Sequence, residues 1–327
     1  MTTRWAVAGT GSMAEVFLED FAHVPDAEVV AIGSRSTERA REFAERHGVS
    51  EGFTYADLMA AEVDVVYIAT PHPQHRDLAL AAIAAGRAVL VEKAFTATLA
   101  GTREVVDAAR SAGVFCMEGM WTRFQPAVAR ARQLVAADAI GEVIGVQVDF
   151  GAFRTYDVSD RLFDPALGGG ATLDLGVYAV SFAQHFLGSP ERVLATGTRY
   201  PNGTDASAAI ALQYADGRAA SLWCSFTAET PGRALLMGTA GSIEVEPRFH
   251  HPTRLVVRRN GHETEVLDLP ATGRGYTHEI EEVQRCLAAG SVESPLMPLD
   301  DTLVVMGVLE ETLAQLGITM SEGSVAV

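Results

Sequence analysis

A glycine-rich turn near the start of the chain is the first place where residue types and their spacing point to chemistry. Residues 9–14 read Gly-Thr-Gly-Ser-Met-Ala, a GxGxxA pattern that follows an apolar run and opens a helical pattern. The first glycine permits a tight turn, the second lets the backbone approach a pyrophosphate, and the small Ala14 lets helix and strand pack closely. The free N–H groups of such a helix N-terminus favour negative charge. The residues expected to hold the dinucleotide here are Gly9, Thr10, Gly11, Ser12 and Met13.

A plain tight turn between a strand and a helix is the alternative reading of this motif. Its position between a strand and a helix, within a series of such units, favours the dinucleotide. The residues after the second expected strand then separate NAD from NADP. NAD enzymes typically carry an acidic residue there to hold the ribose 2′-hydroxyl. This chain has Ser34, followed by Arg35 and Arg39. A serine with one or two arginines suits a 2′-phosphate through charge-assisted hydrogen bonds, so we expect NADP, with NAD as the alternative, although an exposed surface role is equally ordinary for Arg39.

The elements that must position these residues follow from the pattern of the first 120 residues. Short apolar runs alternate there with helical patterns. The expected strands are residues 5–8, 28–32, 63–69, 88–91 and 114–117, and the expected helices include 37–47, 74–85 and 99–112. Gly48 and Gly113 stand just past two of these helices, as glycine often does at a helix C-terminus. The alternating order predicts a parallel, doubly wound Rossmann sheet.

The pattern changes after residue 120 to strands of alternating character. We expect strands at 143–150, 193–199, 206–214, 218–227, 234–238, 242–245, 255–258 and 263–267, and helices at 124–137, 171–186, 276–288 and 299–316. Asp216-Gly217 marks a hairpin between two of the strands. The chain is thus expected to hold a Rossmann domain in residues 1–120 and an α+β domain with an open, mostly antiparallel sheet in residues 121–327. A late helix could still pack back on the first domain.

Composition narrows the class of protein. The 327 residues are 48% hydrophobic, which is enough for two ordinary domains. A formal net charge of −17 argues against binding to nucleic acid or to an anionic membrane surface. Cys116, Cys224 and Cys286 are far apart, which suggests free thiols in a reducing compartment. We see no signal-peptide pattern and no run of about 18 apolar residues, so we expect a cytoplasmic protein.

Further motifs occur at fixed places in this framework. Residues 70–75 read Thr-Pro-His-Pro-Gln-His after one expected strand, and residues 91–94 read Val-Glu-Lys-Ala after the next. Residues 117–124, MEGMWTRF, lie at the domain junction, and residues 161–170, RLFDPALGGG, lead into DLGVY at 174–178. Together these motifs resemble the glucose-fructose oxidoreductase / inositol dehydrogenase (Gfo/Idh/MocA) family. The WTRF and DLGVY segments look most like its dimeric dihydrodiol dehydrogenase and NADP-dependent D-xylose dehydrogenase branch. The family usually has Glu-Lys-Pro where this chain has Ala94, which affects the loop geometry more than the chemistry.

The resemblance implies a catalytic pair from two different domains. It places Lys93 beside the nicotinamide and makes Tyr178 the proton donor or acceptor. A free tyrosine titrates near ~10, and a nearby ammonium lowers that value, so the lysine would help the tyrosine act as a base. Asp174 lies four residues before Tyr178, so on an α-helix both would point to one face. In relatives the matching aspartate binds substrate or orients the pair.

The resemblance also gives expectations for the surrounding residues. Further cofactor contacts are expected from Thr70, Pro71, His72, His75, Glu92, Lys93, Trp121 and Arg123. Substrate contacts are expected from Phe153, Arg161, Asp174 and Tyr178. His75 could instead simply open the helix that follows it. No metal is expected, because His250 and His251 are adjacent in a loop and the cysteines lack zinc-site spacing.

The function expected from these residues is NADP-dependent hydride transfer to or from a sugar, a polyol or a cyclic vicinal diol. An NAD-assisted glycosidase on the same fold is a second reading, which release of a leaving group without accumulation of NADPH would favour. A non-catalytic cofactor sensor is a third, and the presence of both Lys93 and Tyr178 argues against it. Because one face of the second domain's sheet must be covered, we expect a homodimer or tetramer that associates through that sheet.

Overall fold

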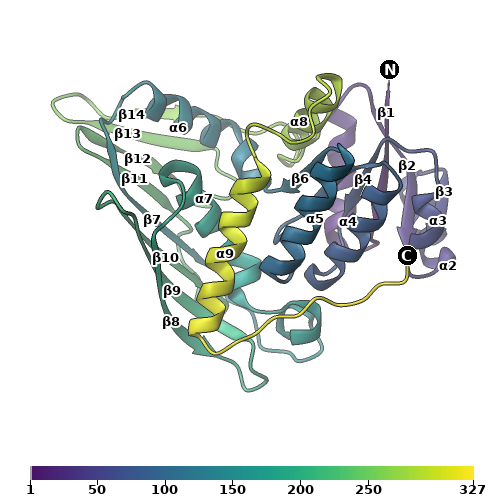
Figure 1. Cartoon of the computed structure of the whole chain (residues 1–327). Coiled ribbons are helices and arrows are strands. Elements are labelled where there is room, and N and C mark those ends of the chain that lie inside the picture. Colours follow the sequence, from purple (N-terminus) through teal and green to yellow (C-terminus); the bar gives the residue numbers. More distant parts are fainter. Residues whose placement is uncertain (1) are drawn as a thin grey trace. The chain divides into compact units, whose positions relative to one another are not determined.

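The computed structural model describes residues 2–327, and their contacts divide the chain into two units. The first unit contains the chain up to Gly119 together with residues Thr272–Leu303 and Ser321–Val327. The second contains Met120–Ala271 and Val304–Met320. The sequence pattern assigned everything after residue 120 to a second domain, whereas two later segments pack with the first unit. Figure 1 shows the elements of both units with their labels.

The first unit is built on a six-stranded sheet with the order β3-β2-β1-β4-β5-β6. Its strands are β1 (Thr3–Ala8), β2 (Ala27–Ser34), β3 (Glu51–Thr54), β4 (Val65–Ile68), β5 (Ala88–Glu92) and β6 (Cys116–Gly119). Every neighbouring pair is parallel, which confirms the doubly wound sheet. Sequence reasoning missed β3 and the short helix after it, because β3 has only four residues and lacks the continuous apolar run of the buried strands.

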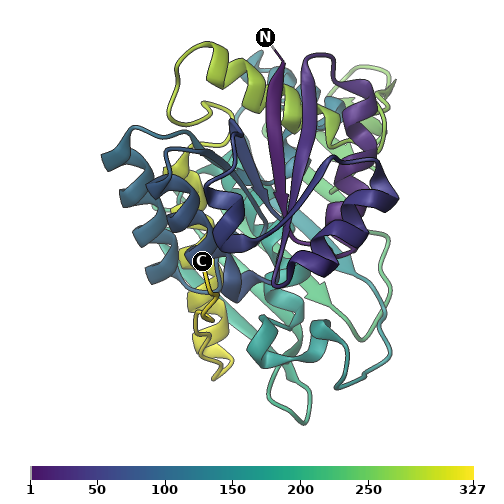
Figure 2. The same cartoon turned by 90° about the vertical axis from the view of Figure 1, so that its right-hand side faces the viewer.

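Helices lie on both sides of this sheet (Figure 2). They are α1 (Ser12–Asp20), α2 (Thr37–His47), α3 (Tyr55–Met59), α4 (His75–Ala84), α5 (Leu99–Ala112) and α8 (Thr277–Ala288). The strands β4 and β5 are buried along their whole length, because helices cover both faces of the sheet. The ends of α2 and α5 were predicted to the residue. Ser36 and Thr98 accept hydrogen bonds from the first turns, and Gly48 and Gly113 adopt the left-handed conformation after the last.

Asp20 explains why α8 belongs to the first unit. Its side chain is 1% exposed. It accepts hydrogen bonds from the backbone N–H groups of Arg274 (2.7 Å), Tyr276 (2.7 Å) and Thr277 (2.9 Å). A single buried carboxylate at the end of α1 therefore satisfies the amides at the start of α8, some 250 residues later in the chain.

The second unit is built on an eight-stranded sheet with the order β14-β13-β12-β11-β7-β10-β9-β8. Its strands are β7 (Val143–Gly151), β8 (Arg192–Arg199), β9 (Asp205–Gln213), β10 (Ala219–Ser225), β11 (Ala234–Gly238), β12 (Gly241–Val245), β13 (Arg254–Arg259) and β14 (Glu265–Asp268). All neighbouring pairs are antiparallel except β7 and β10, which run parallel in the middle of the sheet. The expected open, mostly antiparallel sheet is confirmed.

The helices of this unit include α6 (Pro126–Ala136) and α7 (Val177–Leu187), and α9 (Leu299–Gln315) contributes its later residues. The segment expected as one helix over 171–186 is a π-helix over Thr172–Gly176 followed by α7. The stretch Pro165–Leu187 is long and apolar enough to span a membrane, the only such stretch among residues 2–327. Polar residues such as Asp174 and Gln184 interrupt the stretch, so it is not a continuous apolar run. Since 83% of its most apolar window is buried inside the structure, it acts as a core element.

Candidate functional site

The turn between β1 and α1 has the features of an anion site. Gly9 adopts a φ of +135°, and a Cβ there would lie 2.5 Å from the carbonyl oxygen of Ala69, so only glycine fits. A Cβ at Gly11 would instead meet open space within 4 Å. Gly11 and Ser12 are exposed, and no side chain caps the first turn of α1. Ala14 is fully buried. The N–H groups of this turn are therefore open to an approaching pyrophosphate, as the GxGxxA pattern predicts.

Two arginines follow β2, the strand that pairs with β1. Ser34 is the buried last residue of β2, and Arg35 is exposed directly after it. The backbone N–H of Arg39 donates to the Ser36 hydroxyl at 3.3 Å, which caps α2. Burial raises the pKa of Tyr55, while Arg35 and Arg39 both lower it. Both guanidinium groups thus act on one place at the end of β2, where an anionic group would be attracted.

His75 joins the loops that follow β4 and β5. Its Nδ1 lies 3.1 Å from the carbonyl oxygen of Ala94 and 3.2 Å from that of Phe95, and its Nε2 lies 2.7 Å from that of Thr70. Burial lowers the pKa of this imidazole to about 4, against the opposing effect of the carbonyl groups. The side chain is 0% exposed. The ring is enclosed by protein and holds two loops together, and its expected contact with the cofactor stays a prediction.

Other residues expected at this edge of the sheet are less buried than His75. Thr70 and Pro71 are half-buried in the loop after β4, and His72 is a buried residue at the start of a 3₁₀ turn. Lys93 is half-buried and follows the last residue of β5 directly. The peptide bond between Lys93 and Ala94 is cis. These loops leave the carboxyl ends of adjacent parallel strands, which is where ligands bind in open α/β sheets.

Glu92 connects Lys93 to the core of the first unit. One of its carboxylate oxygens accepts a hydrogen bond from the Tyr67 hydroxyl at 2.5 Å, and the other accepts from the backbone N–H of Lys93 at 3.2 Å. Tyr67 is fully buried and stacks on Phe17 with ring centroids 3.7 Å apart. Burial, and then the nearby Glu92 carboxylate, raise the Tyr67 pKa well above its usual value, so its hydroxyl remains a donor. Glu92 thus orients the backbone at Lys93.

A second buried carboxyl group lies near Glu92. Glu279 of α8 is 0% exposed, and its pKa is raised well above the usual range by burial and then by Glu92 and Asp20. Its two oxygens have no hydrogen-bond partner among the protein atoms described. Glu279 therefore keeps its proton to a higher pH than an exposed carboxyl group does. Sequence reasoning did not find it, because nothing local marks an acidic residue on a helix as buried.

Tyr178 lies in an aromatic cluster within the second unit. Its side chain is 8% exposed on α7, and the indole Nε1–H of Trp121 donates to its hydroxyl oxygen at 3.2 Å. The rings of Phe150 and His250 lie 5.7 Å and 5.4 Å from the Tyr178 ring. His251 stacks on Trp121 with centroids 5.0 Å apart. The hydroxyl of Tyr178 is thus held by a donor within a cluster of aromatic rings.

Phe150, His250 and His251 were not predicted as members of this site. The adjacent histidines were considered only as a metal site and set aside. No group of three or more metal-ligating side chains occurs among residues 2–327. Their aromatic character was the only signal in the sequence, and it does not indicate which distant ring they will contact.

Asp174 does not share an α-helical face with Tyr178 as expected. Residues 172–176 form a π-helix, whose hydrogen bonds span five residues, so the four-residue alignment of an α-helix does not apply. The Asp174 carboxylate lies 3.7 Å from the guanidinium of Arg161, and its side chain is 17% exposed. Arg161 is half exposed, and Phe153 is 57% exposed. These side chains are accessible to a substrate, which is what their expected role requires.

Arg123 has a different role from the cofactor contact expected for it. The side chain is 4% exposed, and its guanidinium donates to the Ser181 hydroxyl at 3.2 Å and to the Gln184 side chain at 2.5 Å. Burial, and then Arg123, lower the pKa of His185 to about 3. The guanidinium thus binds two polar side chains of α7, Ser181 and Gln184, and holds the helix that carries Tyr178.

The glycines 168–170 also serve the protein itself rather than a ligand. A Cβ at Gly169 would lie 2.8 Å from the backbone of Asp164 and Leu162, and one at Gly170 would lie 3.0 Å from Cγ of Asp205. Asp205 is buried and accepts from the backbone N–H of Thr172 at 2.6 Å. Glycine at 169 and 170 therefore lets this loop fold back on itself and pack against Asp205 of β9.

Comparison with known proteins decides the family. The model of the oxidoreductase family with an NAD-binding Rossmann fold, GFO/IDH/MocA, matches residues 3–120, and the model of the GFO/IDH/MocA C-terminal domain matches residues 128–244. The chain belongs to the GFO/IDH/MocA family. It is therefore an oxidoreductase whose first unit is an NAD(P)-binding domain, as the motifs predicted.

Curated relatives and solved structures resemble the whole chain. A trans-1,2-dihydrobenzene-1,2-diol dehydrogenase from Xenopus tropicalis is 35% identical over 98% of this chain and 99% of its own length. The protein of the same name from Homo sapiens is 33% identical, again over 98% of this chain and 99% of its own length. The structure of an aldose-aldose oxidoreductase from Caulobacter crescentus, complexed with glycerol, has a TM-score of 0.88 at 24% identity and covers 97% of this chain and 98% of its own. A 3-ketoreductase from Actinomadura kijaniata in complex with NADP and TDP-benzene has a TM-score of 0.84 at 24% identity, over 96% and 98%. These two structures share the fold.

Proposed function

We propose that this enzyme uses NADP to interconvert an alcohol and a carbonyl group on a sugar, a polyol or a cyclic vicinal diol. The observation that carries the proposal is the 3.2 Å hydrogen bond from Trp121 to the hydroxyl of Tyr178, which fixes a phenol oxygen in an aromatic surface. The full-length relatives named as dehydrogenases of trans-1,2-dihydrobenzene-1,2-diol support a diol, and the aldose-aldose oxidoreductase of the same fold supports a sugar.

The residues of the first unit fit the dinucleotide. The open first turn of α1 would bind the pyrophosphate, and Ser34 with the two arginines after β2 would bind the ribose 2′-phosphate. The loops after β4 and β5, which carry Thr70, Pro71, His72 and Lys93, would face the nicotinamide half. When bound, the nicotinamide accepts or supplies the hydride.

The chain's own residues then handle the proton and the charge. In the oxidative direction Tyr178 accepts the proton of the substrate hydroxyl, and in the reductive direction it returns a proton to the carbonyl oxygen. The Trp121 N–H stabilises the phenolate left after the proton has gone. The Lys93 ammonium stabilises negative charge on the reacting oxygen. Asp174, Arg161 and the exposed ring of Phe153 bind the rest of the substrate.

The catalytic assignment is tested with Tyr178→Phe and Lys93→Met in a screen of sugars, polyols and trans-diols. Absorbance of the reduced nicotinamide reports turnover with NADP+ and NAD+ side by side. Tyr178→Phe should lower kcat by about 10²–10⁴-fold, while the dissociation constant for NADP stays within about twofold of wild type because the cofactor residues are untouched. Unchanged turnover of every accepted substrate would contradict the assignment. Release of a leaving group from glycosides without NADPH would instead support a cofactor-assisted glycosidase.

The preference for NADP is tested with Arg35→Asp. The substitution removes a positive charge beside the expected 2′-phosphate and adds a carboxylate that suits the 2′-hydroxyl of NAD. We expect the ratio of kcat/KM for NADP over NAD to fall by about 10²-fold, as for loss of a charge-assisted contact combined with like-charge repulsion. Arg41→Asp is the matched control, since Arg41 is an exposed residue of the same helix region. Equal ratios in both variants would contradict the role of Arg35.

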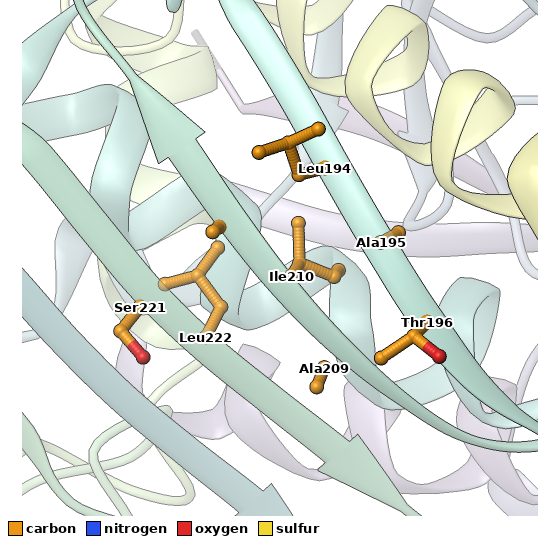
Figure 3. Close-up of a pocket in the computed structure, with 8 residues that line it drawn as sticks. Leu194, Ala195, Thr196, Ala209, Ile210, Ser221 and Leu222 are labelled. Atoms are coloured by element: carbon orange, nitrogen blue, oxygen red, sulfur yellow. The ribbon is translucent and has the colours of Figure 1, made fainter.

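We also propose that the enzyme is a homodimer formed through the second unit's sheet. Leu194, Thr196, Ala209, Ala211 and Ser221 are exposed on β8, β9 and β10. They line a shallow, mostly apolar hollow on the sheet (Figure 3). Ile144 of β7 is 49% exposed as well. A broad apolar sheet face of this kind is typical of an interface.

Light scattering tests the dimer. The wild type should have twice the 34.8 kDa mass of the chain, and Ala209→Arg should shift it to the monomer mass, because a guanidinium would be buried in the interface. Glu42→Arg, at an exposed position on α2 of the first unit, is the control. A monomeric wild type would refute the proposal.

A cytoplasmic location is the corresponding proposal for the compartment. Cys116, Cys224 and Cys286 are all buried free thiols, and free thiols are typical of reducing compartments. Cell fractionation with a tagged chain tests it, and recovery with extracellular or membrane fractions would contradict it.

A further inference from the structure

We propose that Glu322, in the C-terminal tail, is a positioning residue for the loop that carries Lys93. The tail, residues 321–327, belongs to the first unit, although the chain leaves the second unit only at Met320. The inference rests on the proposed role of Lys93 in the reaction. It adds that the lysine's position depends on a segment about 230 residues further along the chain.

Glu322 binds the start of α5, just after the Lys93 loop. One carboxylate oxygen accepts from the backbone N–H of Thr98 at 2.8 Å and from the Thr98 hydroxyl at 2.7 Å. The other accepts from the backbone N–H of Ala97 at 3.5 Å. The Thr98 hydroxyl in turn accepts from the N–H of Gly101, so the tail joins the hydrogen bonds that begin the helix.

The same tail also binds the loop that follows β4. The backbone N–H of Gly323 donates to the carbonyl oxygen of Pro73 at 2.8 Å, and that of Val325 donates to the Asp77 carboxylate at 3.0 Å. Pro73 lies in the segment 70–75, two residues before His75. Glu322, Gly323 and Val325 therefore fasten the tail to the start of α5, to the loop after β4 and to α4. The segments after β4 and β5 leave the edge of the sheet where the nicotinamide half is proposed to bind.

The segment between Lys93 and α5 is held at both ends. His75 lies against the carbonyl groups of Ala94 and Phe95, directly after the lysine. The Thr96 hydroxyl donates to the carbonyl oxygen of Thr98 at 2.7 Å, and its oxygen lies 2.6 Å from that of Thr102. Glu322 fixes Ala97 and Thr98 from outside. Without the Glu322 carboxylate, Ala97 and Thr98 lose these hydrogen bonds. The loop that sets the position of Lys93 can then shift.

Gly101 offers a way to remove this contact without changing the tail. A Cβ added at Gly101 would lie 2.8 Å from Cδ of Glu322, so the flexible carboxylate must move away. Gly101 lies in the first turn of α5 and has no positive φ, and alanine is the better helix former there. Gly101→Ala should therefore displace Glu322 while leaving the helix at least as stable as before.

The test uses the full-length enzyme and the substrate accepted in the screen. Glu322→Ala and Gly101→Ala should each lower kcat by about tenfold, because a displacement well below 1 Å at a reacting group already has such effects. The KM for NADP should change by less than about threefold, since the pyrophosphate and 2′-phosphate residues are untouched. Glu322→Gln keeps an oxygen that can accept from Thr98 and should restore at least half of kcat. Ser321→Ala, at the exposed neighbour of Glu322, is the control.

Hydrogen–deuterium exchange at residues 94–101 gives a readout that does not depend on turnover. Both variants should raise exchange there, with no change in the strands of the second unit. Unchanged kcat in Glu322→Ala and Gly101→Ala overturns the proposal, and so does lost kcat with unchanged exchange at 94–101. If Glu322→Ala no longer unfolds cooperatively, the kcat values and exchange rates of Gly101→Ala and Glu322→Gln test the positioning role of Glu322 instead. A different result would separate the two proposals. If Glu322→Ala and Gly101→Ala raise exchange at 94–101 and Lys93→Met has normal kcat, the proposed role of Lys93 has failed, whereas the contact of Glu322 with this segment stands.

Discussion

Replacing Glu279 by glutamine should make the protein more stable, and increasingly so as the pH rises. Glu279 is fully buried on α8, and burial together with Glu92 and Asp20 raises its pKa well above the usual value. The folded chain therefore keeps a proton that the unfolded chain releases above about pH 4.5. The stability that depends on this proton is fully present at acid pH and is lost as the pH rises towards the folded pKa. Glutamine has nearly the same shape and cannot ionise, so the variant escapes this loss.

The magnitude follows from proton counting. One proton retained only by the folded state changes the free energy of unfolding by about 1.4 kcal/mol per pH unit. Between pH 5.5 and 7 the advantage of Glu279→Gln over wild type should therefore grow by about 2 kcal/mol. His75 and His185 are buried with lowered pKa values, so they make both proteins less stable as the pH falls below about 6.5. This effect is common to the two proteins and cancels in the comparison.

Urea unfolding followed by circular dichroism at pH 5.5, 6, 6.5 and 7 measures both proteins. Glu42→Gln, which changes an exposed carboxylate on α2 of the same unit, is the control. A difference between Glu279→Gln and wild type that stays constant across this range would refute the reasoning, because Glu279 would then be ionised in the folded protein as well. A growing difference in the control would show that the effect is not specific to the buried site.

Three further predictions concern single contacts. Gly9→Ala should weaken NADP binding at least about tenfold in a fluorescence titration, because its Cβ would lie 2.5 Å from the oxygen of Ala69 and distort the turn; normal affinity would mean that the turn does not hold the pyrophosphate. Trp121→Phe should lower kcat roughly fivefold with little change in KM for NADP, as for loss of one hydrogen bond of about 1 kcal/mol to Tyr178, and an unchanged kcat would remove Trp121 from the mechanism. Asp20→Ala should lower the free energy of unfolding by about 3 kcal/mol or more, because three backbone amides, two of them buried, lose their acceptor, and a melting temperature equal to that of wild type would contradict this.

The parts of the fold that the sequence predicted well are those with local causes. The helices 37–47 and 99–112 begin and end where expected, because the capping hydroxyl and the terminal glycine of each lie within a residue of the helix. The GxGxxA turn is recognised from neighbouring residues as well, although the need for glycine at position 9 comes from the backbone of Ala69 after β4. The short, half-exposed β3 escaped prediction because four residues of mixed polarity carry no clear period.

The chemistry of the candidate site depended more on tertiary structure. The sequence and its family resemblance named Lys93 and Tyr178, yet they could not say what surrounds either of them. That Phe150 and His250 pack beside Tyr178, and that His75 is enclosed by carbonyl groups, follows only from the folded chain. Helix geometry also mattered, because the π-helix over 172–176 changed which residues Asp174 can face.

By itself, then, the sequence determined the alternation of strands and helices, the glycine-rich turn and the side chains proposed to react. These features depend on residues that are close together along the chain. Backbone sterics and the periodicity of apolar side chains act over such short distances. Only the tertiary structure decided that α8 returns to Asp20 and that Glu322 reaches Thr98. Such contacts join residues more than 220 positions apart. They are selected by the packing of the whole chain, and no local pattern records them.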